Sequence, residues 1–170
     1  MILLKLAAPT DIALIESIGK QSYRHHFSDA WSASGLEAYL DRHFSEPVLQ
    51  AHFLLSSIRY YFPIVDDVVT GLMKIKLNSP LPVEPADKGL ELEKIYLLKN
   101  FVGRGIGGAI LSAMDDEARS RKAPFLWLDV LKSNAGARDL YTRHGFQTIG
   151  EIPFATDVRD IGMWIMRKDI

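Results

Sequence analysis

Apolar positions recur with two different periods along the chain, which predicts a mixture of helices and strands. Residues 12–18 and 106–118 carry apolar side chains every three or four positions, the spacing of amphipathic helices. Residues 2–6 form a short apolar run, and 125–131 is almost entirely apolar, as in a central strand covered on both faces. The pattern predicts one helix that begins near residue 10. It predicts four more over about 34–43, 46–56, 104–121 and 134–144. It predicts strands over 2–6, 59–65, 68–77, 90–98, 125–131, 146–152 and 161–167.

Turn signals indicate how these elements connect. Asp66 and Asp67 form a two-residue joint between two β-rich runs, which predicts a hairpin. Gly145 follows the last predicted helix, at a position where glycine ends helices well. Residues 78–89 hold three prolines, and we expect the longest loop of the chain there. Because helices and strands interleave in a mixed order, the sequence predicts an α/β sheet with both parallel and antiparallel pairs.

The composition narrows the class of protein. The 170 residues, 48% hydrophobic and 24% charged, are expected to form one domain over 1–170. The absence of cysteine excludes disulfides, Cys-ligated metals and a Cys nucleophile. The 20 basic and 21 acidic residues give a net charge of −1, which leaves no electrostatic signal for a nucleic-acid partner. No stretch approaches the ~20 apolar residues of a membrane span, and the first run is too short for a secretion signal, so we expect a soluble, cytoplasmic protein without a membrane partner.

The most informative local feature is a glycine-rich loop between a predicted strand and a predicted helix. It consists of Val102, Gly103, Arg104, Gly105, Ile106, Gly107 and Gly108. Glycines let successive N–H groups turn toward one point, and a helix N-terminus adds about half a positive charge. Glycines in a helix cost about 1 kcal/mol each relative to alanine, which a purely structural turn seldom requires. We therefore expect a phosphate or pyrophosphate site.

Two common phosphate motifs compete for this loop. A nucleoside triphosphatase loop needs Lys-Ser or Lys-Thr after its last glycine, and neither follows here. Gly103, Gly105 and Gly108 satisfy the dinucleotide-binding pattern, and Asp129 follows about 20 residues later. The charged strand before the loop, the spacer 99–102 and the short remainder of the chain count against that interpretation.

The loop belongs to a longer ordered pattern. The strand LELEKIYL over 90–97 precedes it, Trp127-Leu-Asp-Val follows it, and a last motif covers 134–146. The positions of that last motif are Asn134, Ala137, Leu140, Tyr141, Gly145 and Phe146. In this order the segments resemble the GNAT family of acetyl-CoA-dependent N-acetyltransferases, whose pyrophosphate loop corresponds to 102–107. Val102 stands where that family usually has Gln or Arg, so we expect weakened phosphate binding.

The resemblance extends to a branch of the family. Residues 27–44, with Ala38-Tyr39-Leu40 and His43-Phe44, resemble the PaiA-type branch, which is associated with polyamine acetylation. The resemblance implies a GNAT fold, with a mixed central sheet of about seven strands and helices on both faces. It implies acetyl transfer from acetyl-CoA to a primary amine, with a small polyamine such as spermidine as the first choice. The alternatives are a protein N-terminal or lysine acetyltransferase and a CoA-binding regulatory module without turnover.

The resemblance also assigns residues to acetyl-CoA. The backbone of the strand end would bind the pantetheine amides as an added strand would, and the glycine loop would hold the pyrophosphate. Asn134 would contact the pantetheine arm, cap its helix, or do both, and Arg143 would reach either a phosphate or solvent. The expected set is Ile95, Tyr96, Leu97, Val102, Gly103, Arg104, Gly105, Ile106, Gly107, Gly108, Asn134, Ala137, Tyr141 and Arg143.

Acetyl transfer to an amine needs a base and an acid. An alkylamine has a pKa of ~10 and arrives protonated at neutral pH, so a base must remove its proton. Glu91 and Glu93 are two apart on a strand, so they face one side, roughly 6.5 Å apart; their alternative role is a solvated sheet face. By resemblance, Glu91 matches the base position of well-known members and Glu93 the acid of the PaiA-like branch. Tyr141 would protonate the departing thiolate, and without cysteine the transfer would be direct, in a ternary complex.

Other side chains complete the expected site. Tyr23, His25, Phe27 and Trp31 are candidates for one wall of the acceptor pocket, with core packing as the alternative for each. The histidines show no ligand spacing, so we expect no metal. The sequence leaves open the acceptor, which glutamate is the base, and whether the chain forms a homodimer.

Overall fold

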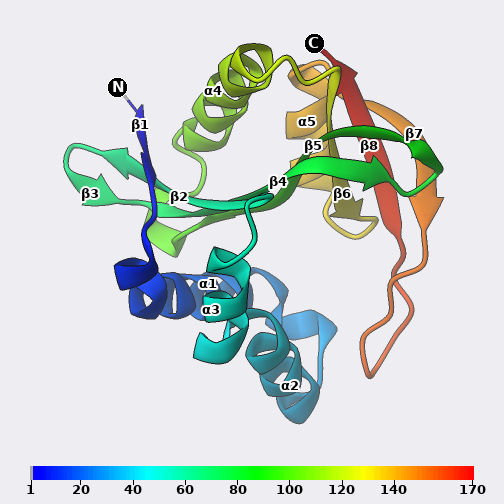
Figure 1. Ribbon diagram of the computed structural model, residues 1–170. Helices are drawn as coiled ribbons and strands as arrows, with labels where there is room; N and C mark the ends of the chain where they lie inside the picture. The colour runs from blue at the N-terminus through cyan, green and yellow to red at the C-terminus, as the bar shows by residue number, and fades with distance from the viewer. Residues whose placement is uncertain (1) are drawn as a thin grey trace.

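A mixed sheet separates two layers of helices in the computed structural model, which describes residues 2–170 (Figure 1). The strands are β1 (Ile2–Leu6), β2 (Ile58–Val65), β3 (Val68–Val69), β4 (Gly71–Leu81), β5 (Glu84–Leu97), β6 (Phe125–Leu131), β7 (Gln147–Ile152) and β8 (Met163–Asp169). The helices are α1 (Ile12–Phe27), α2 (Ala33–Phe44), α3 (Glu46–Phe53), α4 (Ile106–Ser120) and α5 (Ala135–Arg143). Short 3-10 helices cover Pro9–Asp11, Ser28–Ala30 and Lys99–Phe101.

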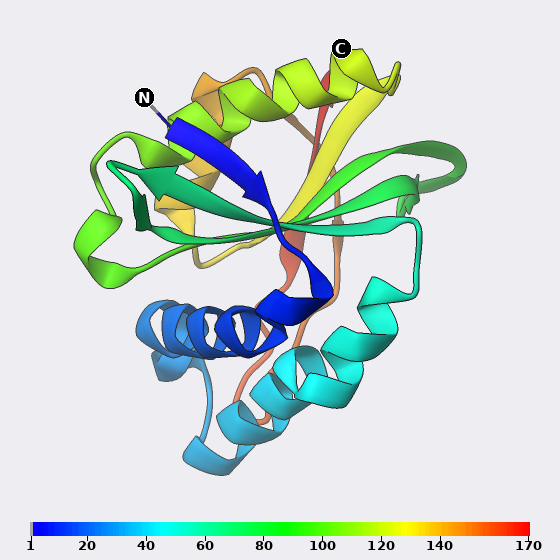
Figure 2. The same ribbon diagram turned by 60° about the vertical axis from the view of Figure 1, so that its left-hand side comes forward.

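The sheet has the order β1-β2-β4-β5-β6-β8-β7, with β3 paired to β2. Only the β5–β6 pair is parallel among the described strands. Helices α1, α2 and α3 lie on one face, and α4 lies on the other (Figures 1 and 2). The mixed α/β sheet with helices on both faces is confirmed. The described sheet has eight strands rather than about seven, because the two residues of β3 form a separate short strand.

Each helical layer covers its own hydrophobic core. The predicted stripe of α4, including Ile110 and Met114, is fully buried against Leu126 and Leu128 of β6. On the other face, α1–α3 bury a second cluster that contains Phe44 together with Tyr60 and Phe62 of β2. The other face of β6 is buried as well, because Phe125 and Trp127 pack with Leu81 and Ile165, so the expectation that 125–131 is a strand covered on both faces is confirmed. The hairpin at Asp66-Asp67 is confirmed too, with φ angles of 49° and 62° at these residues.

The prediction of a long loop over 78–89 was wrong. β4 and β5 extend through this segment as a hairpin, with Leu81 paired to Glu84 across a two-residue turn. Pro80 is tolerated because β2 pairs with β4 only as far as Lys76, so the outer edge of β4 needs no N–H at Pro80. The fully buried Leu81 packs with Phe125, Trp127 and Ile165. This distant apolar contact outweighs the local proline signal.

Replacement of Leu81 tests whether the hairpin is anchored in this way. Leu81→Ala should lower the free energy of unfolding by about 2–5 kcal/mol, because it leaves a cavity among buried side chains. Leu54→Ala is the matched control, since Leu54 is 87% exposed. Urea denaturation of both variants measures the difference. Equal, small losses would show that the segment behaves as a loop.

Candidate active site

The sheet opens between its two central strands. Within residues 2–170, β5 and β6 pair only at Leu90 with Leu126 and at Glu91 with Trp127. β5 nevertheless continues to Leu97, and β6 continues to Leu131. Beyond the last pair, the edge of β5 that faces β6 has no strand partner. Its backbone groups are suited to an extended ligand that adds to the edge as a strand would, although the Leu97 carbonyl already accepts a hydrogen bond from His26 Nε2 at 2.9 Å.

A β-bulge in β5 accompanies this opening. Lys94 pairs with Lys74 and Leu92 pairs with Ile75, so that Glu93 is the extra residue of β5. A bulge bends its strand and increases the local twist, which directs β5 away from β6. The bulge also shifts the alternation of side chains. Leu92 and Ile95 therefore both contact the α4 core, although they are three residues apart.

Glu91 and Glu93 share the opposite face, where both carboxylates approach Lys76. The distances from Lys76 Nζ to an Oε2 atom are 3.7 Å for Glu91 and 3.1 Å for Glu93. Glu93 also forms ion pairs with Lys74 at 2.8 Å and with Lys94 at 3.1 Å. The side chains of Lys74 and Lys94 are only 4% and 6% exposed. Glu93 is thus the centre of a lysine cluster formed by Lys74, Lys76 and Lys94.

These surroundings shift the pKa values of the two glutamates in opposite directions. Burial alone would raise the pKa of Glu93, but Lys94, Lys74 and Lys76 hold it well below its usual range. Burial raises the pKa of Glu91, which accepts a hydrogen bond from Ser79 Oγ at 2.5 Å. Three lysines face two glutamates, so the negative charges of the pair are offset by their neighbours. Sequence reasoning missed the lysines, whose signal is the alternating Lys74 and Lys76 in an otherwise apolar strand.

Asp129 of β6 is a further carboxylate at the opening. It lies two residues beyond Trp127, the last residue of β6 paired with β5, and it pairs with Ile165 of β8. Burial, with Glu91 as the next contribution, raises the pKa of Asp129 to about 6. The sequence drew attention to this residue only as the acidic position of the dinucleotide pattern. A lone charge within an apolar strand is the signal that could have identified it.

Tyr141 reaches the same region from α5. It is half-buried, and its ring meets Phe146 edge-on with centroids 6.0 Å apart. Burial, followed by the charge of Asp129, raises the pKa of Tyr141 to about 12. The Tyr141 hydroxyl is therefore fully protonated at neutral pH. Asn134 caps the same helix, since its Oδ1 accepts from the Ala137 N–H at 3.2 Å, and Arg143 is exposed near the helix end.

The glycine-rich loop combines two different roles for its glycines. Gly103 and Gly105 have φ angles of 77° and 76°, and a Cβ built on either would meet nothing within 4 Å. They give the loop its left-handed turns beneath open space at the start of α4. Gly107 and Gly108 instead allow α4 to approach α5, because a Cβ there would lie 3.0 Å from Leu140 and 2.9 Å from His144. The loop therefore presents N–H groups at the N-terminus of a 15-residue helix, where an anion is favoured.

The aromatic residues of α1 lie mainly within the core. Tyr23 is 3% exposed, stacks on Tyr39 with centroids 4.5 Å apart, and accepts a hydrogen bond from Trp31 Nε1 at 3.2 Å. Tyr23 therefore packs in the core, the alternative that the sequence left open for it, while Phe27 and Trp31 are half-buried. His25 is exposed.

The loop between β7 and β8 approaches this wall, because Asp157 accepts from the Ser32 N–H at 3.1 Å. Phe154 of the same loop meets the Trp31 ring edge-on, with centroids 6.3 Å apart. These contacts hold the loop against the residues that precede α2.

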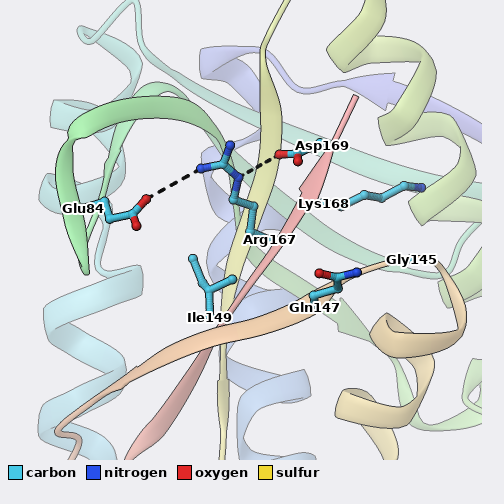
Figure 3. A pocket seen from close by; sticks show the side chains of 7 residues that line it. All are labelled: Glu84, Gly145, Gln147, Ile149, Arg167, Lys168 and Asp169. Atoms are coloured by element: carbon cyan, nitrogen blue, oxygen red, sulfur yellow. Dashed lines mark hydrogen bonds and ion pairs between the residues drawn. The ribbon is translucent and has the colours of Figure 1, made fainter.

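A surface groove of about 470 Å³ lies elsewhere, between the β4–β5 hairpin and strands β7 and β8 (Figure 3). Arg167 crosses it, and its guanidinium is already paired with Glu84 at 3.9 Å and Asp169 at 2.8 Å. Residues 2–170 contain no group of three or more His, Asp or Glu side chains arranged to hold a metal. No helix of the same residues is long and apolar enough to span a membrane.

Known proteins resemble this chain in sequence and in fold. The sequence model of the acetyltransferase (GNAT) family matches residues 20–146. An uncharacterized N-acetyltransferase from Lactobacillus delbrueckii subsp. lactis is 26% identical over 144 residues, which cover 85% of this chain and 83% of that protein. A PaiA N-acetyltransferase from Thermoplasma acidophilum, solved with coenzyme A, superposes with a TM-score of 0.78 and 18% identity, covering 100% and 99% of the two chains. A ribosomal-protein-alanine N-acetyltransferase from Brucella melitensis gives a TM-score of 0.67 at 18% identity, covering 99% of each chain.

The open pair of central strands, the glycine loop and the match to this family define an acyltransferase that uses acetyl-CoA. The chain belongs to the acetyltransferase (GNAT) family. The dinucleotide interpretation of the loop is thereby excluded, and the N-acetyltransferase predicted from the sequence is confirmed at the level of the family.

The lysine cluster makes Glu93 a stabilising residue. Glu93→Gln should lower the free energy of unfolding by about 3–5 kcal/mol at neutral pH, because it leaves buried lysines without their counter-charge. Glu84→Gln is the control, since that side chain is 63% exposed. The folded pKa of Glu93 lies below its ordinary value, so its contribution is complete above about pH 4.5 and is lost on acidification. Urea denaturation should therefore show wild type and variant converging at low pH, whereas a constant difference would contradict the ion pairs.

Proposed function

We propose that the protein transfers the acetyl group of acetyl-CoA directly to the primary amine of a small molecule. The observation that supports this most is the opening between β5 and β6, with the Tyr141 hydroxyl and three carboxylates around it. The pantetheine chain would bind along Ile95–Leu97, and the pyrophosphate would bind at Gly103–Gly108. This arrangement would place the thioester near the end of the paired segment.

The charges at the site and the likeness to a known acetyltransferase favour different acceptors. The lysine cluster offsets Glu91 and Glu93, so the site offers little excess negative charge for a long polycation. The likeness to a PaiA acetyltransferase and the sequence motifs favour a polyamine such as spermidine. We infer that one ammonium group is recognised near the thioester and that further positive charges add little. An acceptor with a single amine is therefore our first choice, and spermidine is our second.

A thioester-cleavage assay tests the function and the acceptor together. Acetyl-CoA is offered with a simple alkylamine, an amino acid, spermidine and a lysine-containing peptide, and the release of free CoA is followed with a thiol reagent. The proposal predicts turnover with monoamines at a kcat/KM close to that with spermidine. A strong preference for spermidine that weakens with added salt would restore the polyamine interpretation. CoA binding without turnover of any acceptor would indicate a binding module instead.

Tyr141 is proposed as the acid that protonates the leaving thiolate. Tyr141→Phe keeps the ring and its contact with Phe146, so packing should survive while the proton donor is lost. General acid catalysis contributes ~10²–10⁴-fold, and kcat should fall by about this factor with little change in the Kd for CoA. Stopped-flow turnover and calorimetry provide the two quantities. An unchanged chemical rate would leave Tyr141 with a packing role alone.

A further inference from the structure

The three carboxylates at the opening differ in how many hydrogen bonds and ion pairs they already form with neighbouring side chains. Glu93 is bound by three lysines at 2.8–3.1 Å, and Glu91 is buried with Ser79 Oγ at 2.5 Å and Lys76 at 3.7 Å. No hydrogen bond or ion pair within residues 2–170 involves the Asp129 carboxylate, and the residue is partly exposed. Of the three, Asp129 is therefore the carboxylate with both oxygens open to a ligand.

The position of Asp129 on β6 directs it toward the reacting groups. Trp127, two residues before it, and Ile165, its partner on β8, both pack on the face opposite the α4 core. Asp129 shares that face by strand alternation, and it stands just past the point where β5 leaves β6. Because the sheet is open here, its charge influences the Tyr141 hydroxyl, which approaches from α5 on the other face. The acid and this carboxylate thus meet at one opening.

We propose that Asp129 is the catalytic residue that takes the proton from the acceptor ammonium group. The inference rests on the proposed acetyl transfer and adds the base to it. Glu91 and Glu93 then have supporting parts: Glu93 holds the lysine cluster together, and the negative charge of Glu91 keeps Asp129 ready to accept a proton. The family resemblance assigned no role to Asp129.

These groups account for every proton and electron pair that moves in the reaction. The ammonium gives one proton to the Asp129 carboxylate, and the freed nitrogen lone pair forms the C–N bond at the thioester carbonyl. The tetrahedral intermediate collapses as the C–S bond breaks, and the sulfur takes a proton from the Tyr141 hydroxyl. The nitrogen loses its second proton to water, and the proton held by Asp129 returns to the Tyr141 oxygen. One proton is released overall, with an amide and CoA thiol as products.

The surroundings of Asp129 predict the pH range in which the base works. The charged and titratable groups that act on it or on its neighbours are Glu91, Glu93, Lys94 and Tyr96 of β5, Lys76 of β4, and Tyr141 of α5. With burial they leave the pKa of Asp129 at about 6. The base is active when ionised, so kcat/KM should rise as the pH increases through about 6. Glu93, whose pKa lies well below its usual range, would produce no rise there.

The decisive variants are Asp129→Asn and Asp129→Glu. Asp129→Asn should lower kcat/KM by ~10²–10⁴-fold and abolish the rise near pH 6, whereas Asp129→Glu should recover part of the rate and a shifted rise. Asp116→Asn is the matched control, because its side chain is 85% exposed on α4 and it should keep the wild-type profile. Circular dichroism and the Kd for CoA should stay at wild-type values in all three, which separates catalysis from folding.

Two results would overturn the proposal. The first is an Asp129→Asn enzyme that keeps the rise near pH 6, above all if Glu91→Gln loses it. The second is independent of any acceptor. With aspartate labelled at Cγ by ¹³C, one carboxyl of the wild type should titrate near pH 6 by NMR, and its signal should be missing from Asp129→Asn. If the signal persists in the variant or is absent from the wild type, Asp129 is not the base, and this result needs no turnover of an amine. Failure of the proposed acetyl transfer would instead be seen in the turnover assay of the wild-type enzyme.

Discussion

The loss of pairing between β5 and β6 is the constraint on which the rest of the site depends. Two parallel strands in the middle of a sheet normally satisfy each other's backbone groups, and an open segment leaves donors and acceptors without partners. Here the bulge at Glu93 bends β5 after only two paired positions. We propose that the resulting opening gives the cofactor an edge to bind and lets groups from both faces of the sheet approach the same atoms.

The lysine cluster is connected to the same constraint. The bulge places Glu93 and Lys94 on one face, and β4 contributes Lys74 and Lys76 opposite them. Buried charges are tolerated only when they are paired, and here one carboxylate is shared by three ammonium groups. Lys74 and Lys94 also lie over the rings of Tyr60 and Phe44, each 5.7 Å from the centroid, which ties the open part of the sheet to helices α2 and α3 through the core. These charges thus also connect β4 and β5 to the core beneath α1, α2 and α3.

The sequence predicted the parts of the fold that depend on local patterns. The stripe of α4, the doubly covered β6 and the hairpin at Asp66-Asp67 each depend on a few neighbouring residues. Its main error, the expected loop over 78–89, arose because the contact of Leu81 with Phe125 and Trp127 joins distant segments. The residues of the candidate site divide in the same way. The glycine loop and Tyr141 belong to a linear motif and could be predicted. The lysine cluster is formed by the register of β4 and β5, and the position of Asp129 at the opening is set by where β5 and β6 stop pairing, so neither could be predicted.

We propose that the opening between β5 and β6 receives the cofactor. A crystal structure of the complex with CoA tests this most directly. It should show the pantetheine chain beside Ile95–Leu97, the pyrophosphate on the N–H groups of Gly103–Gly108, and the sulfur within hydrogen-bond reach of the Tyr141 hydroxyl. CoA bound outside this opening, for example in the groove crossed by Arg167, with β5 and β6 still empty between them, would contradict it.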